Sequence, residues 1–254
     1  MKALLSTTYF GPVQWYQKLY RHEAVEIEQW ESFLKQTYRN RCLIATTQGI
    51  QALTVPVERR EETGVRRQES GDRRQETGDR KQENTIRDVR ISDHGNWRHL
   101  HWNALVSAYG ESPFFEYYQD DIRPFFENRW DYLFDFNEAI REKMCELLDI
   151  QPNVSFSLEF KVYSSCVPSV ASEQSSSVEM NTQVAEKSTI NYKQSTINSI
   201  TDFREAINPN HPQPDPGFKP KPYYQVYQQK HGFLPNLSIL DLLFNMGPES
   251  IFYL

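Results

Sequence analysis

The stretch Met1–Glu28, which reads MKALLSTTYFGPVQWYQKLYRHEAVEIE, decides the fold. Lys2–Ser6 is a short apolar run, and the loop after it ends at Gly11-Pro12. Proline is favoured as a first helical residue because its missing N–H would be unpaired there, and apolar residues then recur at helical spacing up to Tyr20. Ala24–Glu28 alternates between apolar and polar residues, as a strand does. This order of strand, helix and strand predicts a right-handed βαβ unit with parallel strands.

The rest of the chain adds elements of both kinds. Apolar runs predict strands over residues 42–46, 52–57, 87–91 and 154–160. Apolar stripes predict helices over 97–109, 134–148 and 238–246, with Asp93 as a cap before the first and Gly247-Pro248 ending the last. Residues 208–222 contain six prolines and predict an extended segment. We therefore expect one mixed α/β domain over residues 1–254, with a partly parallel sheet, flanking helices and a segment 200–254 that packs back onto the domain.

Two polar stretches are expected to form low-complexity insertions. From Arg59 to Ile86, four heptads read RREETGV, RRQESGD, RRQETGD and RKQENTI, with eight Lys/Arg against seven Asp/Glu. A coiled coil needs two apolar positions in each heptad, and these units offer only Val65 and Ile86. We predict a solvated insertion over 59–86 that does not bind nucleic acid, because its charges cancel. The Ser-rich stretch 164–199 predicts a mobile linker.

The composition excludes several classes of protein. A net charge of -6 argues against nucleic-acid binding by bulk positive charge, and an aromatic share of 13% argues against a wholly disordered chain. No apolar run approaches the roughly 18 residues of a membrane span, and the first apolar stretch is too short for a secretory signal. The three widely spaced cysteines fit reduced thiols. We expect a soluble cytoplasmic protein, with the oligomeric state open.

The loop before the first helix is the first candidate site. Ligands of open α/β sheets bind beyond the carboxyl ends of the strands, and helix N-termini attract anions. Thr7, Thr8 and Tyr9 offer hydroxyl groups there, and Gln14 lies in the first helical turn, so we predict that these four residues bind substrate. The alternative is an ordinary connection between strand and helix, because a Gly-Pro pair has low specificity.

Arg39, Asn40 and Arg41 form the second candidate site. Two guanidinium groups beside an amide suit a phosphate or a carboxylate, because each guanidinium can donate two charge-assisted hydrogen bonds. On a strand, Arg39 and Arg41 would point to the same face. The alternative is a solvated strand entry with surface ion pairs that contribute little to stability.

The third candidate is the segment SDHGNWRHLHWN, residues 92–103, which holds three histidines. His99 and His101 would lie about 200° apart around a helix and could not share an ion, so we predict no metal site. We expect Trp97 and His99 to contact substrate. His101 falls on the apolar face, where it is either a general acid or base whose pKa burial has shifted, or a core histidine bonded to a backbone carbonyl.

Seven segments follow one another in an order that is typical of a known family. They are KQTYRNR (35–41), LTVPV (53–57), IRDVRI (86–91), NWRHLH (96–101), SAY (107–109), SPFF (112–115) and GFLPNLSILDLLFN (232–245). Their succession resembles the WbqC-like family, and in particular its members from Bacteroidetes. Members often carry Gln-Pro before the tyrosine of the opening loop, where this chain has Thr7-Thr8, while Tyr9 and Pro12 are kept.

The resemblance implies a role in the synthesis of O-antigen or capsule polysaccharide. Our first hypothesis is a transferase that attaches a small acyl or aminoacyl group, glycyl among them, to an amino sugar. His101 would be the general base, residues 39–41 would hold one substrate and the opening loop the other. The substrate would be a small molecule such as a nucleotide-linked or lipid-linked sugar, and no cofactor can be assigned.

The second hypothesis is a non-catalytic assembly factor that binds a sugar or a protein through an aromatic surface. Convergence of the three candidate segments on one pocket would favour catalysis, and dispersal over a flat aromatic face would favour binding. The aromatic surface would comprise Trp15, Trp30, Trp97, Trp102 and Tyr117.

Overall fold

The computed structural model describes residues 2–58, 85–160, 200–210 and 212–254. Residues 59–84 of the predicted heptad insertion and the whole predicted linker 164–199 lie outside these ranges. Among the described residues, no helix combines the length and the hydropathy of a transmembrane span.

The chain opens with the predicted βαβ unit. β1 (Lys2–Ser6) is followed by α1 (Val13–Arg21) and β2 (Ala24–Glu28). The two strands pair in parallel from Lys2 opposite Ala24 to Ser6 opposite Glu28. The middle residues of β1 are fully buried, as expected of a parallel strand that is covered on both faces.

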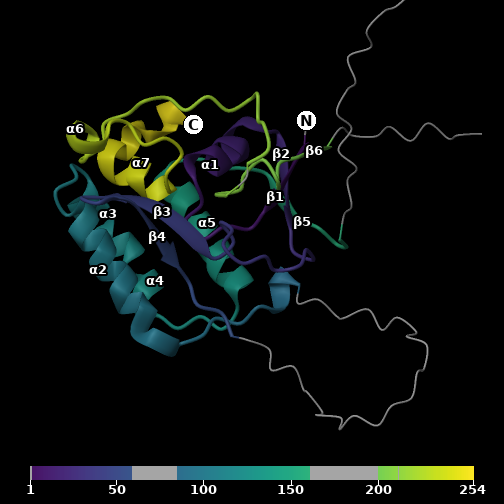
Figure 1. Ribbon diagram of the computed structural model, residues 1–254. Helices are drawn as coiled ribbons and strands as arrows, with labels where there is room; N and C mark the ends of the chain where they lie inside the picture. Colours follow the sequence, from purple (N-terminus) through teal and green to yellow (C-terminus); the bar gives the residue numbers. More distant parts are fainter. Residues whose placement is uncertain (1, 59–84, 161–199, 211) are drawn as a thin grey trace, which may run out of the picture.

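β1 lies in the middle of a four-stranded parallel sheet. β5 (Val154–Phe156) pairs with β2, and β6 (Ile200–Asp202) pairs with β1, which gives the order β5-β2-β1-β6. The chain leaves β1 toward β2 on one side and returns as β6 on the other, so the strand order reverses at β1. Figure 1 shows this sheet on one side of the molecule and the hairpin of β3 (Arg41–Thr46) and β4 (Gly49–Thr54) on the other. The predicted mixed α/β class is confirmed.

Three strand predictions need correction. The strand expected over 154–160 ends at Phe156. The strand expected over 52–57 begins at Gly49 and ends at Thr54, and Pro56 could not have donated a ladder hydrogen bond. The strand expected over 87–91 is a 3₁₀ helix, Ile86–Asp88, closed by a hydrogen bond from the Asp88 N–H to the Thr85 carbonyl (2.9 Å). Only isolated bridges follow it, so this segment has no ladder partner along its length.

The predicted helices are close to those observed. α2 (Trp97–Tyr109) matches the prediction residue for residue, α5 is Leu133–Leu147, and α7 is Ile239–Met246. Asp93 does not cap α2, because a 3₁₀ turn over His94–Asn96 intervenes. The chain also continues beyond Gly247 as a 3₁₀ helix. Three short helices were not predicted, namely α3 (Phe115–Ile122), α4 (Pro124–Glu127) and α6 (Gln228–His231).

The segment before α7 is bonded to the loop after β1. Ser238 donates its hydroxyl hydrogen bond to the Phe10 carbonyl (2.7 Å), and the Ile239 N–H donates to the Gly11 carbonyl (2.9 Å). A Cβ at position 11 would lie 2.4 Å from Thr8 Oγ1, so the turn of the loop itself favours glycine there. Residues from the two ends of the chain therefore fix the loop that carries the first candidate site.

Candidate functional site

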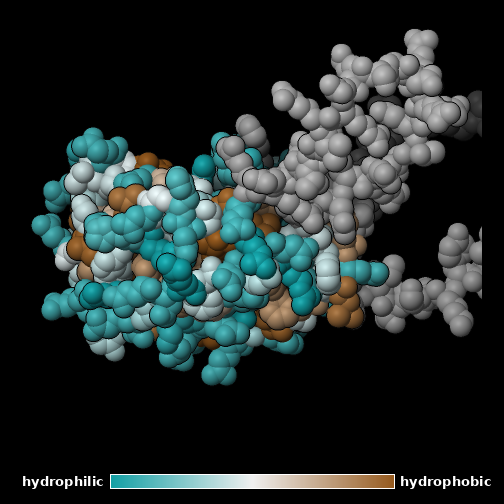
Figure 2. Space-filling model, turned by 90° about the horizontal axis from the view of Figure 1, so that it is seen from below, coloured by the Kyte–Doolittle hydropathy of each residue, from teal (hydrophilic) through white to brown (hydrophobic). Residues whose placement is uncertain are grey.

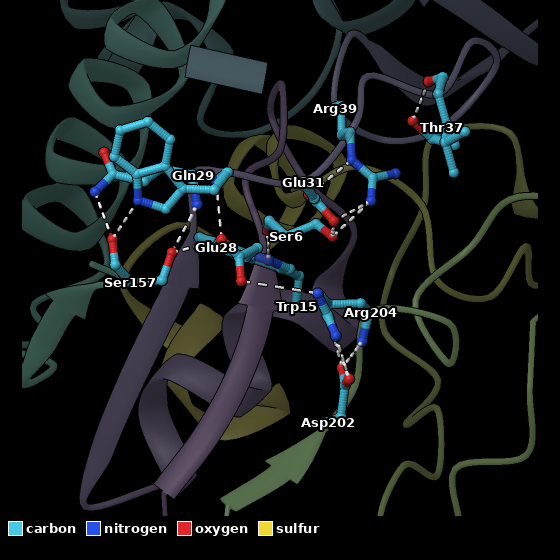
Figure 3. A network of polar contacts seen from close by, with 12 residues as sticks. Ser6, Trp15, Glu28, Gln29, Glu31, Thr37, Arg39, Ser157, Asp202 and Arg204 are labelled. Carbon is cyan, nitrogen blue, oxygen red and sulfur yellow. Dashed lines mark hydrogen bonds and ion pairs between the residues drawn. The ribbon is translucent and has the colours of Figure 1, made fainter. Parts of the chain in front are cut away.

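Polar side chains gather at the carboxyl edge of the parallel sheet (Figure 3). Ser6 ends β1, Glu28 ends β2, Ser157 follows β5 directly and Asp202 ends β6. Ligands of open α/β proteins bind beyond this edge, at the point where the strand order reverses. That point lies here between β1 and β6.

A buried ion pair organises this edge. Arg39 donates from Nε and Nη2 to the two carboxylate oxygens of Glu31, at 2.8 and 2.5 Å, and both side chains are less than a tenth exposed. Arg39 Nη2 also donates to the Ser6 hydroxyl group (3.0 Å), which itself donates to Glu31 (3.1 Å). Within the described ranges, Nη1 of Arg39 makes no hydrogen bond.

A narrow hollow lies beside this ion pair, between the ends of β1 and β6. Its volume of about 10 Å³ has room for one water-sized group. Burial raises the pKa of Tyr38 to about 12, so its hydroxyl group is neutral and can donate at neutral pH. The hollow is lined by Ser6, Thr7, Thr8, Trp15, Tyr38, Arg39, Phe203, Arg204 and Ile207.

The structure thus brings together Thr7, Thr8 and Arg39 from two predicted segments. The sequence did not indicate Ser6, Tyr38 or Arg204, which complete the hollow. Tyr38 directly precedes Arg39 in the sequence, and the Tyr38 carbonyl accepts a hydrogen bond from the Tyr9 N–H (2.8 Å), a contact between distant segments that the sequence did not reveal. β6 and the arginine that follows it were absent from the predicted elements altogether.

Other predicted contacts are taken by protein groups. Gln14 donates from its side chain to Asp215 (2.8 Å) and accepts from Asn236 (3.0 Å). The Asn236 side chain also accepts from the Gln14 N–H (2.9 Å), and the Leu237 carbonyl accepts from the Val13 N–H (3.0 Å). The N-terminus of α1 is therefore satisfied by the chain itself, and these contacts do not support an anion there.

Arg39 and Arg41 do not form a joint clamp. β3 begins only at Arg41, whose Nε donates to Thr54 Oγ1 (3.1 Å), whereas Arg39 turns back to Glu31. Asn40 donates to the Val55 carbonyl (2.9 Å). The expectation of two guanidinium groups on one strand face is wrong, because the strand starts two residues too late.

The histidine segment divides between core and surface. His101 is buried, and its Nδ1 lies 2.9 Å from the Tyr9 hydroxyl oxygen. Burial lowers the pKa of His101 to about 4, and a backbone hydrogen bond at Thr54 partly offsets that effect. Trp97 is buried beside it, while His99 is exposed on α2 and does not approach the sheet edge. The three segments do not converge on one pocket.

The five aromatic residues that were predicted to form a recognition surface do not all reach the surface of the protein. Trp15 and Trp97 are buried and donate their indole N–H groups to the carbonyls of Ser6 (2.8 Å) and Ser92 (3.0 Å). Tyr117 is exposed, and Trp30 and Trp102 are half-buried on separate elements. The side chains are dispersed, so they do not make a continuous recognition face.

Comparisons of the sequence with known proteins place this chain in a family. The model of the WbqC-like protein family matches residues 75–253, a range that includes Trp97, His99 and His101 but not the candidate residues before Cys42. An uncharacterized protein of Mycobacterium tuberculosis, Rv1507c, is 27% identical over 225 residues, which cover 87% of this chain and 83% of that protein. No solved structure matches. Since the family model spans well over half of the sequence, the chain belongs to the WbqC-like protein family, which is associated with polysaccharide biosynthesis.

Proposed function

We propose that the protein is a transferase of surface-polysaccharide biosynthesis, O-antigen or capsule, that moves a small acyl or aminoacyl group, glycyl among them, to the amino group of a sugar. The family supports the polysaccharide context. The observation that carries the binding step is the hollow at the sheet edge, where Tyr38 and Arg39 both hold donor groups that no other described residue uses.

In this proposal, the hollow receives one oxygen of an anionic group. The volume admits a single water-sized group, which fits a terminal oxygen of a phosphate or a carboxylate. Arg39 Nη1 and the neutral Tyr38 hydroxyl group would donate to it, and charge-assisted bonds of this kind are the strong ones. Thr7 and Thr8 complete the wall. The rest of a nucleotide-linked or lipid-linked sugar would lie outside, over the sheet edge.

His101 is a positioning residue in this proposal. Its imidazole holds the Tyr9 hydroxyl group, and the Tyr9 N–H in turn holds the Tyr38 carbonyl. His101 therefore acts on the hollow through the opening loop, and its place in the core does not support the role of general base that the sequence indicated. In the transfer, an amide bond forms at the sugar nitrogen and the thioester bond of an acyl-CoA donor breaks, and the thiolate of the donor leaves and takes up the proton that the amine loses.

The test compares binding and transfer for two tyrosine variants. Purified protein is screened by thermal shift with UDP-linked amino sugars, undecaprenyl-phosphate-linked sugars, amino acids and acyl-CoA donors, and the products are weighed by mass spectrometry. Tyr38→Phe removes a hydroxyl group that has no hydrogen-bond partner among the described residues, so the free energy of unfolding stays unchanged. Binding of the phosphate-bearing sugar weakens about tenfold, because a hydrogen bond to a charged group is lost. Tyr20→Phe, on the exposed part of α1, is the matched control and leaves binding unchanged.

Three results would contradict the proposal in different ways. If none of the sugars stabilises the protein, nucleotide-linked and lipid-linked sugars are not its substrates. If Tyr38→Phe and the parent protein bind the sugar equally well, the hollow beside Arg39 is not the binding site. Binding without an increase in the mass of the sugar would favour the alternative of a non-catalytic factor that recognises the sugar.

A further inference from the structure

A second hollow, independent of the proposed function, lies between the first half of α2 and α4. Its volume is about 390 Å³, within the range of small-molecule sites. Three arginines and two aromatic side chains are among the residues that line it. The lining residues are Asp93, Asn96, Arg98, His99, Trp102, Arg123, Phe126, Glu127 and Arg129.

Positive charge in this hollow exceeds negative charge. Asp93 serves two guanidinium groups, since Arg98 Nη1 lies 2.6 Å from one of its carboxylate oxygens and Arg129 Nη1 lies 3.6 Å from the other. Arg123 and Glu127 pair with each other at 2.6 Å. The hydrogen bond from Arg98 is the main cause that lowers the pKa of Asp93, so this carboxyl group is ionised. Three arginines face two carboxylates, which leaves one positive charge uncompensated.

Arg98 is held in place with part of its hydrogen-bonding capacity unused. Its guanidinium group lies over the indole of Trp97, 4.8 Å from the ring centroid, and the side chain is 14% exposed. Within the described part of the chain, Nε and Nη2 have no hydrogen-bond partner and are themselves buried, so an anion in the hollow bonds to them only after a small shift of the guanidinium group. The group is already desolvated, which lowers the cost of binding an anion.

Trp102 and Phe126 supply an apolar wall beside this charge. Their ring centroids are 5.9 Å apart, and Trp102 is half-buried. An aromatic face of this kind packs against the C–H face of a pyranose ring. His99 and Asn96 add polar groups on the rim. Seen from below Figure 1, the described surface is mainly hydrophilic, with hydrophobic patches among the polar side chains (Figure 2).

We propose that this hollow binds a pyranose that carries an oxyanion, with the anion on Arg98 and Arg129 and the ring against Trp102. The oxyanion can be the phosphate of a sugar phosphate or the carboxylate of a uronic acid. Binding of either sugar here does not require the hollow at the sheet edge to bind a ligand.

Isothermal titration of the full chain at low salt tests this site with four probes: glucose 6-phosphate, glucuronate, glucose and inorganic phosphate. At least one of the two anionic sugars binds, and it binds at least tenfold more tightly than glucose and than phosphate. Arg129→Gln weakens its binding three- to tenfold and leaves folding unchanged, because this side chain is 84% exposed. Arg90→Gln is the matched control, since Arg90 packs over Tyr132 away from the hollow and its loss leaves binding unchanged.

The choice between the two anionic probes identifies the source of the oxyanion. Binding of glucose 6-phosphate alone assigns a sugar phosphate, and binding of glucuronate alone assigns an acidic sugar. The proposal is overturned if neither anionic sugar binds, or if glucose or inorganic phosphate binds as tightly as the anionic sugar that binds best. Equal losses in Arg129→Gln and Arg90→Gln would show general attraction to positive charge and would also overturn it.

Discussion

His101 shows how one buried residue links pH to stability. Its folded-state pKa of about 4 lies below the unfolded value of about 6.5, so the unfolded chain takes up the proton first as the pH falls. The stability that the neutral, buried imidazole allows is fully present above pH 6.5 and is lost as the pH falls from about 6.5 to about 4. The free energy of unfolding falls by about 3 kcal/mol over this range.

Chemical denaturation between pH 4 and pH 7 measures this slope. His101→Gln lowers stability at pH 7, because it disturbs the contact with Tyr9, and it flattens the slope, because no imidazole remains to titrate. His99→Gln, on the exposed side of the same helix, leaves the slope as it is. An unchanged slope in His101→Gln would show that other groups cause the pH dependence.

At the scale of single residues, the sequence predicted which face of a helix a residue occupies better than it predicted which side chains that residue contacts. The helical period placed His101 on the apolar face correctly, because that period is local. Its partner Tyr9 lies 92 residues away, and Arg39 meets Glu31 through a turn that no periodicity describes. The candidate site could therefore be predicted only as separate segments.

At the level of elements, the start of α7 depends on one hydroxyl group. Ser238 Oγ accepts from the Leu240 N–H (3.3 Å) and donates to the Phe10 carbonyl (2.7 Å). Ser238→Ala removes the cap and leaves a buried carbonyl without this donor, so the free energy of unfolding falls by about 2 kcal/mol. Urea denaturation measures the loss. Ser112→Ala is the matched control, because the buried Ser112 hydroxyl group has no partner among the described residues and its removal is near neutral. Equal losses in both variants would contradict the capping role.

The elements that were predicted correctly are those with a strong local pattern. The βαβ unit, α2 and α7 each carry an apolar period or a terminal signal that is visible in a short window. β6 has only three residues, and it is a strand because it pairs with Lys2–Leu4, about 200 positions earlier. The segment 87–91 has strand-like composition, but single-residue bridges and a 3₁₀ turn take the place of a ladder.

At the scale of the whole molecule, Asp215 ties the C-terminal segment to α1. Its carboxylate lies 2.6 Å from Lys18 Nζ, and both side chains are almost fully buried. Lys18 also lies 4.4 Å from the ring centroid of Phe203, so three distant parts of the chain meet there. Asp215→Ala leaves a buried ammonium group unpaired, and the free energy of unfolding falls by about 3–5 kcal/mol.

A double-mutant cycle separates this pair from simple loss of packing. Lys18→Met combined with Asp215→Ala recovers most of the stability, because no uncompensated charge remains. Glu127→Ala, which removes the exposed partner of Arg123, is the control and costs less than about 1 kcal/mol. Additive losses for Lys18→Met and Asp215→Ala would show that the two side chains are not coupled.

The central place of β1 also governs when the protein can finish folding. On the ribosome, β1 leaves the exit tunnel long before Ile200–Asp202 have been translated, and the residues that bond the loop after β1 come later still. Until then, the nascent strand has one open edge that invites wrong partners. Slow translation between β5 and β6 would lengthen the time during which this edge of β1 stays unpaired.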